Sequence, residues 1–293
     1  MKNIILSALV LVLSVAPSLS QDKPLRIIMI GGHPDDCELQ GGGTAILYQK
    51  MGHAVKFLAV TNGDAGHQEM DRPAIASRRL AEAKEAAKRL GVECEVLSNH
   101  DGGLVPSLEV RLDIIRKIRE WNADIVFSPR PSDYHPDHRY TGILVQDAAY
   151  LVGVPNVAPD TPPLKKNPVF FYFQDPFQRP NPFRPDVAID ISSVFDQKVE
   201  ALDAHQSQFY EWLPWIGGYL DKVPTDSAER KKWLAVNRGR KITPEVRKSL
   251  EKWYGGKATG VSHAEAFEIC EYGTQPSEDD LKRLFPMLEK KTK

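Results

Sequence analysis

The chain has 293 residues, of which 42% are hydrophobic and 26% are charged, and Lys and Arg (38) almost balance Asp and Glu (39). This composition is typical of an ordinary globular protein and excludes a low-complexity chain. The formal net charge is −1 and no basic stripe is present. We therefore expect no nucleic-acid partner, because phosphate backbones are bound by clustered Lys and Arg.

The first twenty residues differ from the rest. Residues 1–3 carry a Lys, residues 4–15 are almost entirely apolar, and small residues end the segment at Ser20. This layout is typical of a cleaved secretory signal peptide, and the apolar run is too short for a comfortable membrane span; an uncleaved anchor is the alternative. We expect a signal peptide at residues 1–20, a secreted or periplasmic protein, and no stable membrane insertion after cleavage.

From residue 25 onward, strand-like and helix-like segments alternate. Strands are predicted at residues 25–30, 54–61, 92–97, 124–128, 169–173 and 187–191. Helices are predicted at residues 44–50, 73–90, 108–121 and 194–205. Because the strands are apolar throughout, the pattern predicts an α/β fold: a Rossmann-like parallel sheet flanked by helices. In such sheets, ligands bind beyond the carboxyl ends of the strands.

Residues 209–293 are predicted to form a mainly helical C-terminal extension, packed on the domain of residues 21–208. Helix is expected within residues 225–253. Packing in a small helical core is favoured over sugar stacking for the aromatic residues Trp212, Trp215, Tyr219, Trp233, Trp253 and Tyr254. The segment with His263, Glu265 and Glu268 is interpreted as a solvated helix face.

Three cysteines, Cys37, Cys94 and Cys270, are too few for a disulfide framework in a chain of this length. At least one of them must be unpaired or bonded to another molecule. We therefore expect a hydrophobic core to stabilise the fold.

Polar segments follow the first and fourth predicted strands. Residues 33–38 (HPDDCE) come after the first strand and residues 133–138 (DYHPDH) after the fourth. Taken singly, a His at a strand end is usually a hydrogen-bonded loop residue, and an Asp pair often caps a helix. Two such loops favour a metal site. If the strands are neighbours, His33, Asp36 and His138 supply three ligands and leave an open position, which is the layout of a catalytic zinc site.

These segments resemble the signature of the LmbE/PIG-L deacetylase family. The resemblance is carried by residues 33–38, 41–44 (GGGT), 61–66 (TNGDAG), 79–91, 100–102 (HDG), 135–138 (HPDH) and 205–208 (HQSQ). It covers residues 25–208 in the same order, and it implies a zinc-dependent deacetylase that acts on an N-acetylated, GlcNAc-type sugar or glycan fragment.

The resemblance also implies roles for particular residues. The implied metal ligands are His33, Asp36 and His138, for Zn²⁺ or another divalent ion such as Fe²⁺. The implied catalytic residues are Asp35 as general base, His135 beside the oxyanion and Asp137 to orient His135. The implied substrate contacts are Arg79 and Asp101. Cys37 stands at a variable position near the metal, and Glu38 is interpreted as either a functional residue or a helix cap.

Other classes of function also fit parts of the pattern. Two His and one carboxylate also form the facial triad of non-haem iron enzymes, which we expect on an all-β barrel instead. A secreted, non-catalytic carbohydrate-binding protein would not need Asp35, His135 and Asp137. A dinucleotide site is disfavoured, because residues 31–34 do not form the G-x-G-x-x-G motif. The sequence gives no indication of oligomeric state.

Overall fold

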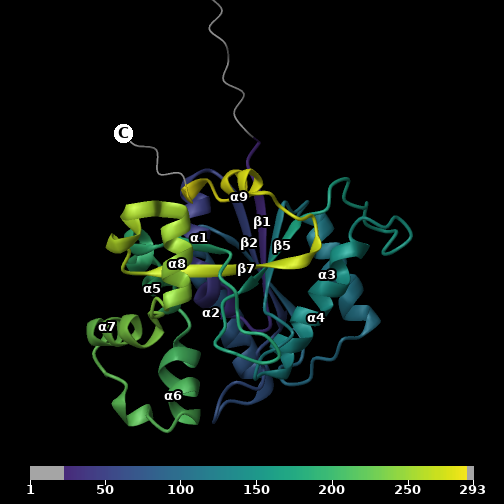
Figure 1. Cartoon of the computed structure of the whole chain (residues 1–293). Helices are drawn as coiled ribbons and strands as arrows, with labels where there is room; N and C mark the ends of the chain where they lie inside the picture. The colour runs from purple at the N-terminus through teal and green to yellow at the C-terminus, as the bar shows by residue number, and fades with distance from the viewer. Residues whose placement is uncertain (1–22, 289–293) are drawn as a thin grey trace, which may run out of the picture.

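A central sheet runs through the protein, with helices on both of its faces (Figure 1). The structure is a computed structural model that describes residues 23–288, so the signal peptide predicted at residues 1–20 lies outside the described residues. The described strands form one sheet in the order β3-β2-β1-β4-β5-β7-β6. Their bounds are β1 Arg26–Gly31, β2 Ala54–Thr61, β3 Glu93–Asn99, β4 Ile125–Ser128, β5 Val169–Phe173, β6 Val187–Asp190 and β7 Ala264–Gly273.

The predicted sheet is confirmed, with one difference. Strands β1 to β5 pair with one another in parallel, whereas β7 is antiparallel to both β5 and β6. The sheet is therefore mixed. Strand β7 falls in the segment interpreted as a solvated helix face, and that interpretation is wrong: Ala264, Ala266 and Phe267 are buried on the strand. Its side chains pack on both faces of the sheet, so no single apolar stripe marks it in the sequence.

The helices cover the sheet in two layers. Their bounds are α1 Asp36–Lys50, α2 Arg72–Leu90, α3 Leu108–Glu120, α4 Pro136–Leu151, α5 Phe195–Leu202, α6 Leu213–Ile216, α7 Ser227–Arg238, α8 Pro244–Tyr254 and α9 Glu278–Leu284. Short helical turns lie at η1 Ser192–Val194, η2 Ser207–Trp212, η3 Leu220–Lys222, η4 Gly255–Gly260 and η5 Pro286–Leu288. Side chains of β1 alternate between the layers: Ile27 and Met29 pack with α1 and α5, and Ile28 and Ile30 pack with α3 and α4.

Local sequence explains where several helices begin and end. The Asp71 side chain accepts a hydrogen bond from the Ala74 amide at the start of α2, and Gly91 ends that helix at a φ of 75°. Helix α4 was not predicted, although Pro136 stands in its first turn, where proline is favoured. The helix predicted within residues 225–253 is divided into α7 and α8. No helix among residues 23–288 combines the length and the apolar composition needed to span a bilayer.

Candidate metal centre and active site

Polar side chains converge beyond the carboxyl ends of four adjacent strands, β3, β2, β1 and β4. The β1–α1 connection supplies His33 and Asp35, and Asp36 is the first residue of α1. The β3–α3 loop supplies Asp101. The β4–α4 segment supplies the remaining side chains: Asp133, His135, Asp137 and His138. The structure thus brings the predicted site residues together from positions far apart in the sequence.

Three atoms in this group are spaced as ligands of one metal ion. His33 Nδ1 lies 3.1 Å from His138 Nε2, His138 Nε2 lies 3.2 Å from Asp36 Oδ2, and His33 Nδ1 lies 3.7 Å from Asp36 Oδ2. Ligands about 2.1 Å from a tetrahedral zinc ion are separated by about 3.4 Å. The donor geometry of His33, Asp36 and His138 therefore fits a divalent ion.

Two wider groups of donors overlap with this set. Ligand atoms of His33, His135 and His138 lie within 4.8 Å of one another, as do those of His33, Asp101, His135 and Asp137. In the second group, the Asp137 carboxylate already accepts hydrogen bonds from the amides of Gly102 (2.7 Å) and Leu104 (3.3 Å). We therefore favour His33, Asp36 and His138 as the metal ligands. Of their three facing atoms, only Asp36 Oδ2 accepts a backbone hydrogen bond, from the His33 amide.

Carboxylates hold the far side of each imidazole. His33 Nε2 lies 3.1 Å from both Asp101 Oδ1 and Asp137 Oδ2, and His138 Nδ1 lies 3.0 Å from Asp133 Oδ1. A proton on each of these nitrogens leaves His33 Nδ1 and His138 Nε2 facing each other and Asp36. Carboxylate partners of this kind orient metal-binding histidines. Asp133 belongs to the second polar segment, residues 133–138, but no role was predicted for it from the sequence; its position five residues before His138 is the signal that could have identified it.

The carboxylates beside His33 and His138 shape the titration of these two imidazoles. Burial lowers the pKa of His33, but hydrogen bonds to Asp101 and Asp137 and the charge of Asp36 raise it to about 9. Burial likewise lowers the pKa of His138, but Asp36 and Asp133 raise it to about 11. The carboxylates around His33 and His138 thus stabilise positive charge at the two imidazoles.

Asp35 lies beside the three donors but is held by a different partner. Its Oδ1 accepts a hydrogen bond of 2.9 Å from Arg79 Nη2, and Arg79 Nη1 lies 3.5 Å from Asp101 Oδ2. Arg79 is 2% exposed, and a side chain at Gly63 would collide with its guanidinium group. Arg79 and Asp101 both line the cavity described below, but the contacts of Arg79 fix the positions of two site carboxylates.

The geometry around His135 differs from the predicted one. Its Nδ1 accepts a hydrogen bond of 3.2 Å from the backbone amide of Asp137, and the Asp137 carboxylate lies 4.0 Å away. The Asp137 carboxylate instead bonds to His33. With Nδ1 acting as an acceptor, the hydrogen of a neutral His135 is on Nε2. Burial, with the charges of His33 and His138, lowers the pKa of His135 and favours this neutral form.

Two residues within the first motif face away from the donors. The Cys37 thiol donates to the Met29 carbonyl (3.2 Å) in the hydrophobic core, and burial raises its pKa well above the usual range. Although Cys37 is close in sequence to the proposed metal ligands, its thiol is protonated and buried in the core, so it is not a metal ligand. Glu38 is not a helix cap: it is 3% exposed, and its Oε1 lies 3.3 Å from Nε2 of the fully buried His205.

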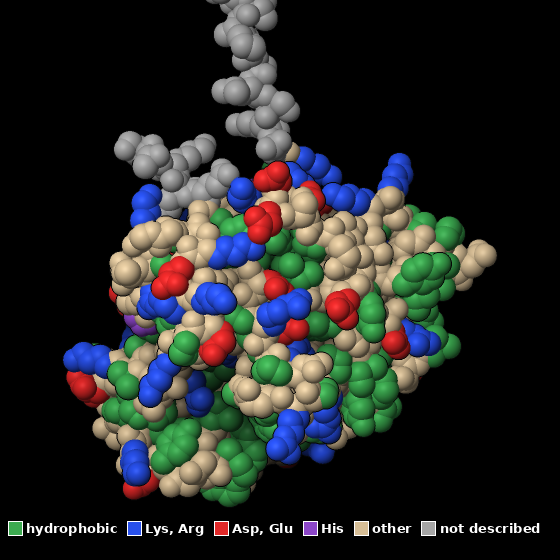
Figure 2. Space-filling model, viewed as in Figure 1, with side chains coloured by type: hydrophobic (Ala, Val, Ile, Leu, Met, Phe, Trp, Pro, Cys, Tyr) green, Lys and Arg blue, Asp and Glu red, His purple; other side chains and the backbone are tan. Residues whose placement is uncertain are grey.

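The donors open into a cavity of about 440 Å³. One part of its lining comes from the loops that carry the His and Asp donors and includes Tyr134, and another part comes from residues beyond 208: Trp212, Leu213, Arg238 and Arg240. None of these four was predicted as a site residue, because they lie in a segment without a matching motif. Trp215 and Ile216 of α6 and Leu220 of η3 are exposed apolar residues, and hydrophobic side chains gather at the lower left of Figure 2, where Figure 1 places α6.

The aromatic residues of the extension fall into two groups. Trp233, Trp253 and Tyr254 pack against the core, which confirms the packing interpretation for them. Trp212 and Trp215 are stacked on each other, with ring centroids 5.5 Å apart, and Trp215 is 48% exposed. For this pair the packing interpretation is wrong, because one ring lines the cavity and the other faces solvent.

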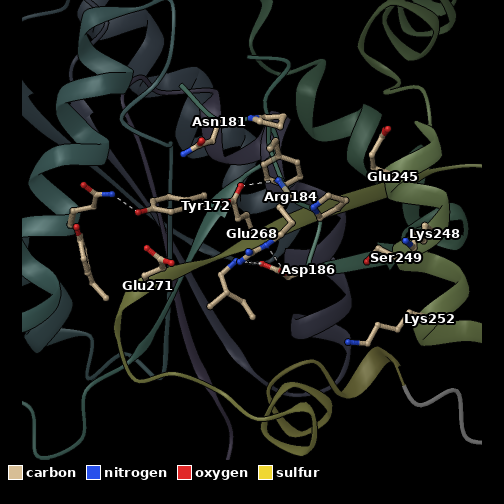
Figure 3. Close-up of a pocket in the computed structure, with 16 residues that line it drawn as sticks. Tyr172, Asn181, Arg184, Asp186, Glu245, Lys248, Ser249, Lys252, Glu268 and Glu271 are labelled. Atoms are coloured by element: carbon tan, nitrogen blue, oxygen red, sulfur yellow. Dashed lines mark hydrogen bonds and ion pairs between the residues drawn. The ribbon is translucent and has the colours of Figure 1, made fainter. Parts of the chain in front are cut away.

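A larger cavity, of about 720 Å³, lies between β7, α8 and the segment before β6 (Figure 3). It contains none of the predicted site residues. Arg184 lies close to two acids on its lining, donating from its amide to Glu268 and pairing through its side chain with Asp186. Because no group of metal-binding side chains lies within it among the described residues, we place the chemistry in the smaller cavity.

The sheet order and the His/Asp donor set define an α/β protein with a metal-binding group at the carboxyl edge of its strands. Residues 28–149 match the family described as PIG-L, GlcNAc-PI de-N-acetylase. The chain is 34% identical over 207 residues to the diacetylchitobiose deacetylase of Thermococcus kodakarensis, covering 65% of this chain and 74% of that protein. The chain therefore belongs to the PIG-L (LmbE) family.

Other relatives include two further deacetylases and one hydratase. The solved structure of N,N'-diacetylchitobiose deacetylase from Pyrococcus horikoshii superposes with a TM-score of 0.62 at 27% identity, covering 83% of each chain. A probable N-acetyl-α-D-glucosaminyl L-malate deacetylase from Bacillus cereus is 28% identical, covering 72% of this chain and 94% of that protein. A 4-oxalmesaconate hydratase from Pseudomonas putida is 24% identical, covering 63% of this chain and 74% of that protein. Family membership therefore does not by itself identify the reaction.

Proposed function

We propose that the protein is a metal-dependent deacetylase that hydrolyses the acetamide group of an N-acetylated sugar. The observation that carries this proposal is the spacing of 3.1–3.7 Å between His33 Nδ1, Asp36 Oδ2 and His138 Nε2, beside a second carboxylate and a third imidazole. The deacetylases among the relatives support the same reaction.

A divalent ion held by His33, Asp36 and His138 would polarise the amide carbonyl and acidify a water molecule. Zinc suits two nitrogen donors and one oxygen donor, and Fe²⁺ is the alternative that metal analysis tests. The carboxylates of Asp101, Asp133 and Asp137 keep the two imidazoles in the orientation that binding requires.

In the proposed reaction, Asp35 accepts the proton of the attacking water. Its hydrogen bond from Arg79 holds the carboxylate beside the donors. His135 donates a hydrogen bond from Nε2 to the oxyanion that forms when water adds to the carbonyl carbon. Asp35 then returns the proton to the nitrogen as the C–N bond breaks, so acetate and a free amino sugar are the products.

Acetate release from a panel of N-acetylated sugars tests the proposal. We expect activity that a chelator abolishes and that added zinc restores. Absence of acetate release in the metal-loaded protein, together with hydration of an unsaturated acid, would contradict the proposal and favour the chemistry of the hydratase relative.

A further inference from the structure

Two arginines line the catalytic cavity from the C-terminal side. Arg238 is the last residue of α7, and Arg240 follows in the connection to α8. Both lie on the same cavity as His33, Asp35 and Asp36. They belong to the part of the chain beyond residue 208, where the sequence offered no function.

Arg238 has no acidic partner. Among residues 23–288 it makes no hydrogen bond or ion pair, and its Nε is buried without a partner. Its guanidinium carbon lies 5.2 Å from the centroid of the Phe209 ring. The ring can hold the guanidinium group in place, but it does not neutralise the charge.

Arg240 is held only by neutral groups. Its Nη1 donates to the Gln174 carbonyl (2.6 Å) and its Nη2 donates to Gln40 Oε1. Burial lowers its pKa, and the charges of Glu265 and Asp175 oppose that shift. Neither acid lies within ion-pair distance of Arg240 among the described residues.

Both of these nearby acids already have their own basic partners. Asp175 accepts two hydrogen bonds of 2.6 Å from Arg130, and Glu265 accepts one of 2.7 Å from Lys198. The third arginine of the cavity lining, Arg79, is paired with Asp35. Arg238 and Arg240 are thus cations of the cavity lining that the described part of the protein leaves uncompensated.

We propose that the substrate carries an anionic group, a carboxylate or a phosphate, on or beside its N-acetylated ring, and that Arg238 and Arg240 bind this group. The inference rests on the proposed deacetylase function and narrows its substrate class. Guanidinium groups bind carboxylates and phosphates through paired N–H donors, and such bonds are strong where water is partly excluded. The relatives include a deacetylase for a neutral disaccharide and one for a malate glycoside, so they do not decide whether the substrate of this chain carries an anionic group. The residues that line its own cavity are the evidence for that group.

The test compares acetate release from N-acetylglucosamine with release from N-acetylmuramic acid and from N-acetylglucosamine 1- and 6-phosphate. The muramic acid bears a carboxylate on the same ring, and the phosphates bear a phosphate ester, so the preferred compound identifies the anion. We expect kcat/KM to be roughly 10- to 100-fold higher for one of the charged sugars than for N-acetylglucosamine. The preference should weaken as the NaCl concentration rises, because salt screens partly exposed charges.

Arg238→Gln is the decisive variant, because Arg238 makes no hydrogen bond whose loss would disturb the fold. It should lower the ratio of kcat/KM between charged and neutral sugars by about tenfold. Arg240→Gln should lower the same ratio, with thermal melting to measure the effect of losing its bonds to Gln40 and Gln174. Arg230→Gln makes the same change on α7 outside the cavity lining, and it should leave both activities unchanged.

A second measurement does not depend on turnover. Calorimetric titration of the metal-free protein should show tighter binding of the preferred charged sugar than of N-acetylglucosamine, and Arg238→Gln should remove the difference. Equal or better turnover of the neutral sugar, unaffected by Arg238→Gln, would overturn the inference and leave the deacetylase function standing. No acetate from any of the sugars would instead count against the deacetylase function.

Discussion

Asp35 and Asp36 are neighbours in the sequence, yet their carboxylates face different groups. Asp36 Oδ2 lies 3.2 Å from His138 Nε2, whereas Asp35 Oδ1 accepts a hydrogen bond from Arg79. Asp36 begins helix α1, and Asp35 precedes it with an extended φ of 172°. The start of the helix therefore separates a proposed metal ligand from a proposed base within two residues.

Asp35→Asn should separate these two roles. The amide keeps the size of the carboxylate but cannot accept the proton of water, so turnover should fall by about 10²–10⁴-fold while bound metal stays stoichiometric. Asp36→Asn should lose metal first, and excess zinc should partly restore its activity. Metal analysis and acetate release measure both effects; rescue of Asp35→Asn alone would show that the roles are reversed.

Asp137→Asn should weaken metal binding, because its carboxylate orients His33. Loss of such a partner typically costs about 10–100-fold in metal affinity, which competition with a chelator measures. Asp147→Asn is a suitable control on the same helix, since its carboxylate pairs with Arg111 at the surface. If Asp137→Asn slowed turnover and left metal affinity intact, the sequence-based role, orienting His135, would be the better one.

The two motifs contain most of the His and Asp side chains that the fold brings together in the cavity. His33, Asp35 and Asp36 stand in one short segment and His135, Asp137 and His138 in another, so the sequence shows both halves of the site. The sequence did not predict which atoms contact each other. The hydrogen bond between His33 and Asp137, for example, joins residues that are 104 positions apart. Arg238 and Arg240 could not be found, because nothing near them in the sequence marks a site.

Helix α1 is held near its middle by two buried side chains from distant elements. Glu265 of β7 accepts hydrogen bonds from the amides of Gly43 (2.9 Å) and Thr44 (2.7 Å), and Lys198 of α5 donates to the Leu39 carbonyl (2.8 Å). In an undisturbed helix, the Gly43 amide would bond to the Leu39 carbonyl. The Lys198–Glu265 ion pair thus contacts an amide and a carbonyl group that face each other along the helix.

The sequence predicted that this helix begins at Thr44, whereas α1 begins at Asp36. Glycine is a poor helix former, and residues 41–43 are all glycine. The missing side chains are also required, because a Cβ on Gly43 would lie 2.8 Å from Ile191 Cγ2. A tertiary contact from a residue more than 200 positions away outweighs the local preference, and a sequence pattern does not show such a contact.

Glu265→Gln should destabilise the fold. It leaves Lys198, which is 3% exposed, without a compensating charge, and removal of one partner of a buried ion pair typically costs about 3–5 kcal/mol. Urea unfolding measures the change. Glu271→Gln alters an exposed residue of the same strand and should leave the free energy of unfolding nearly unchanged; equal effects of the two variants would contradict the structural role of Glu265.

For the whole molecule, the extension is part of the central sheet. Strand β7 pairs with β5 through Phe171 and Ile269, and with β6 through Ala188 and Ala266. The alternation of strands and helices predicted the parallel part of the sheet. It did not predict that the last strand, β7, lies between β5 and β6, because the order of strands along the chain does not determine their order in the sheet.

A chain that ends at residue 208 should therefore fail to fold. Without β7, strand β6 has no neighbour in the sheet and Phe267 leaves a large gap in the core. A chain that ends at residue 288 is the matched control, since it keeps every described residue. Soluble yield and the cooperativity of thermal unfolding by circular dichroism compare the two, and a cooperative transition in the shorter chain would show that residues 21–208 form a separable domain.

We also propose export with cleavage after Ser20, so that the mature chain begins at Gln21. Mass analysis of the N-terminus of exported protein measures this. Exported, soluble protein that retained Met1 would contradict the proposal.

The position of β7 also governs the order in which a growing chain can complete its sheet. The proposed metal ligands and β1 to β5 are all synthesised before residue 174, but the partner of β5 on its outer side is synthesised nearly a hundred residues later. Until then, β5 is an open edge with the sequence VFFYF. Open, apolar edge strands without Pro or charge readily pair with other chains. The nascent protein is thus prone to aggregation through β5 between synthesis of Phe173 and synthesis of Gly273, when the proposed metal ligands already exist and the sheet is still unclosed.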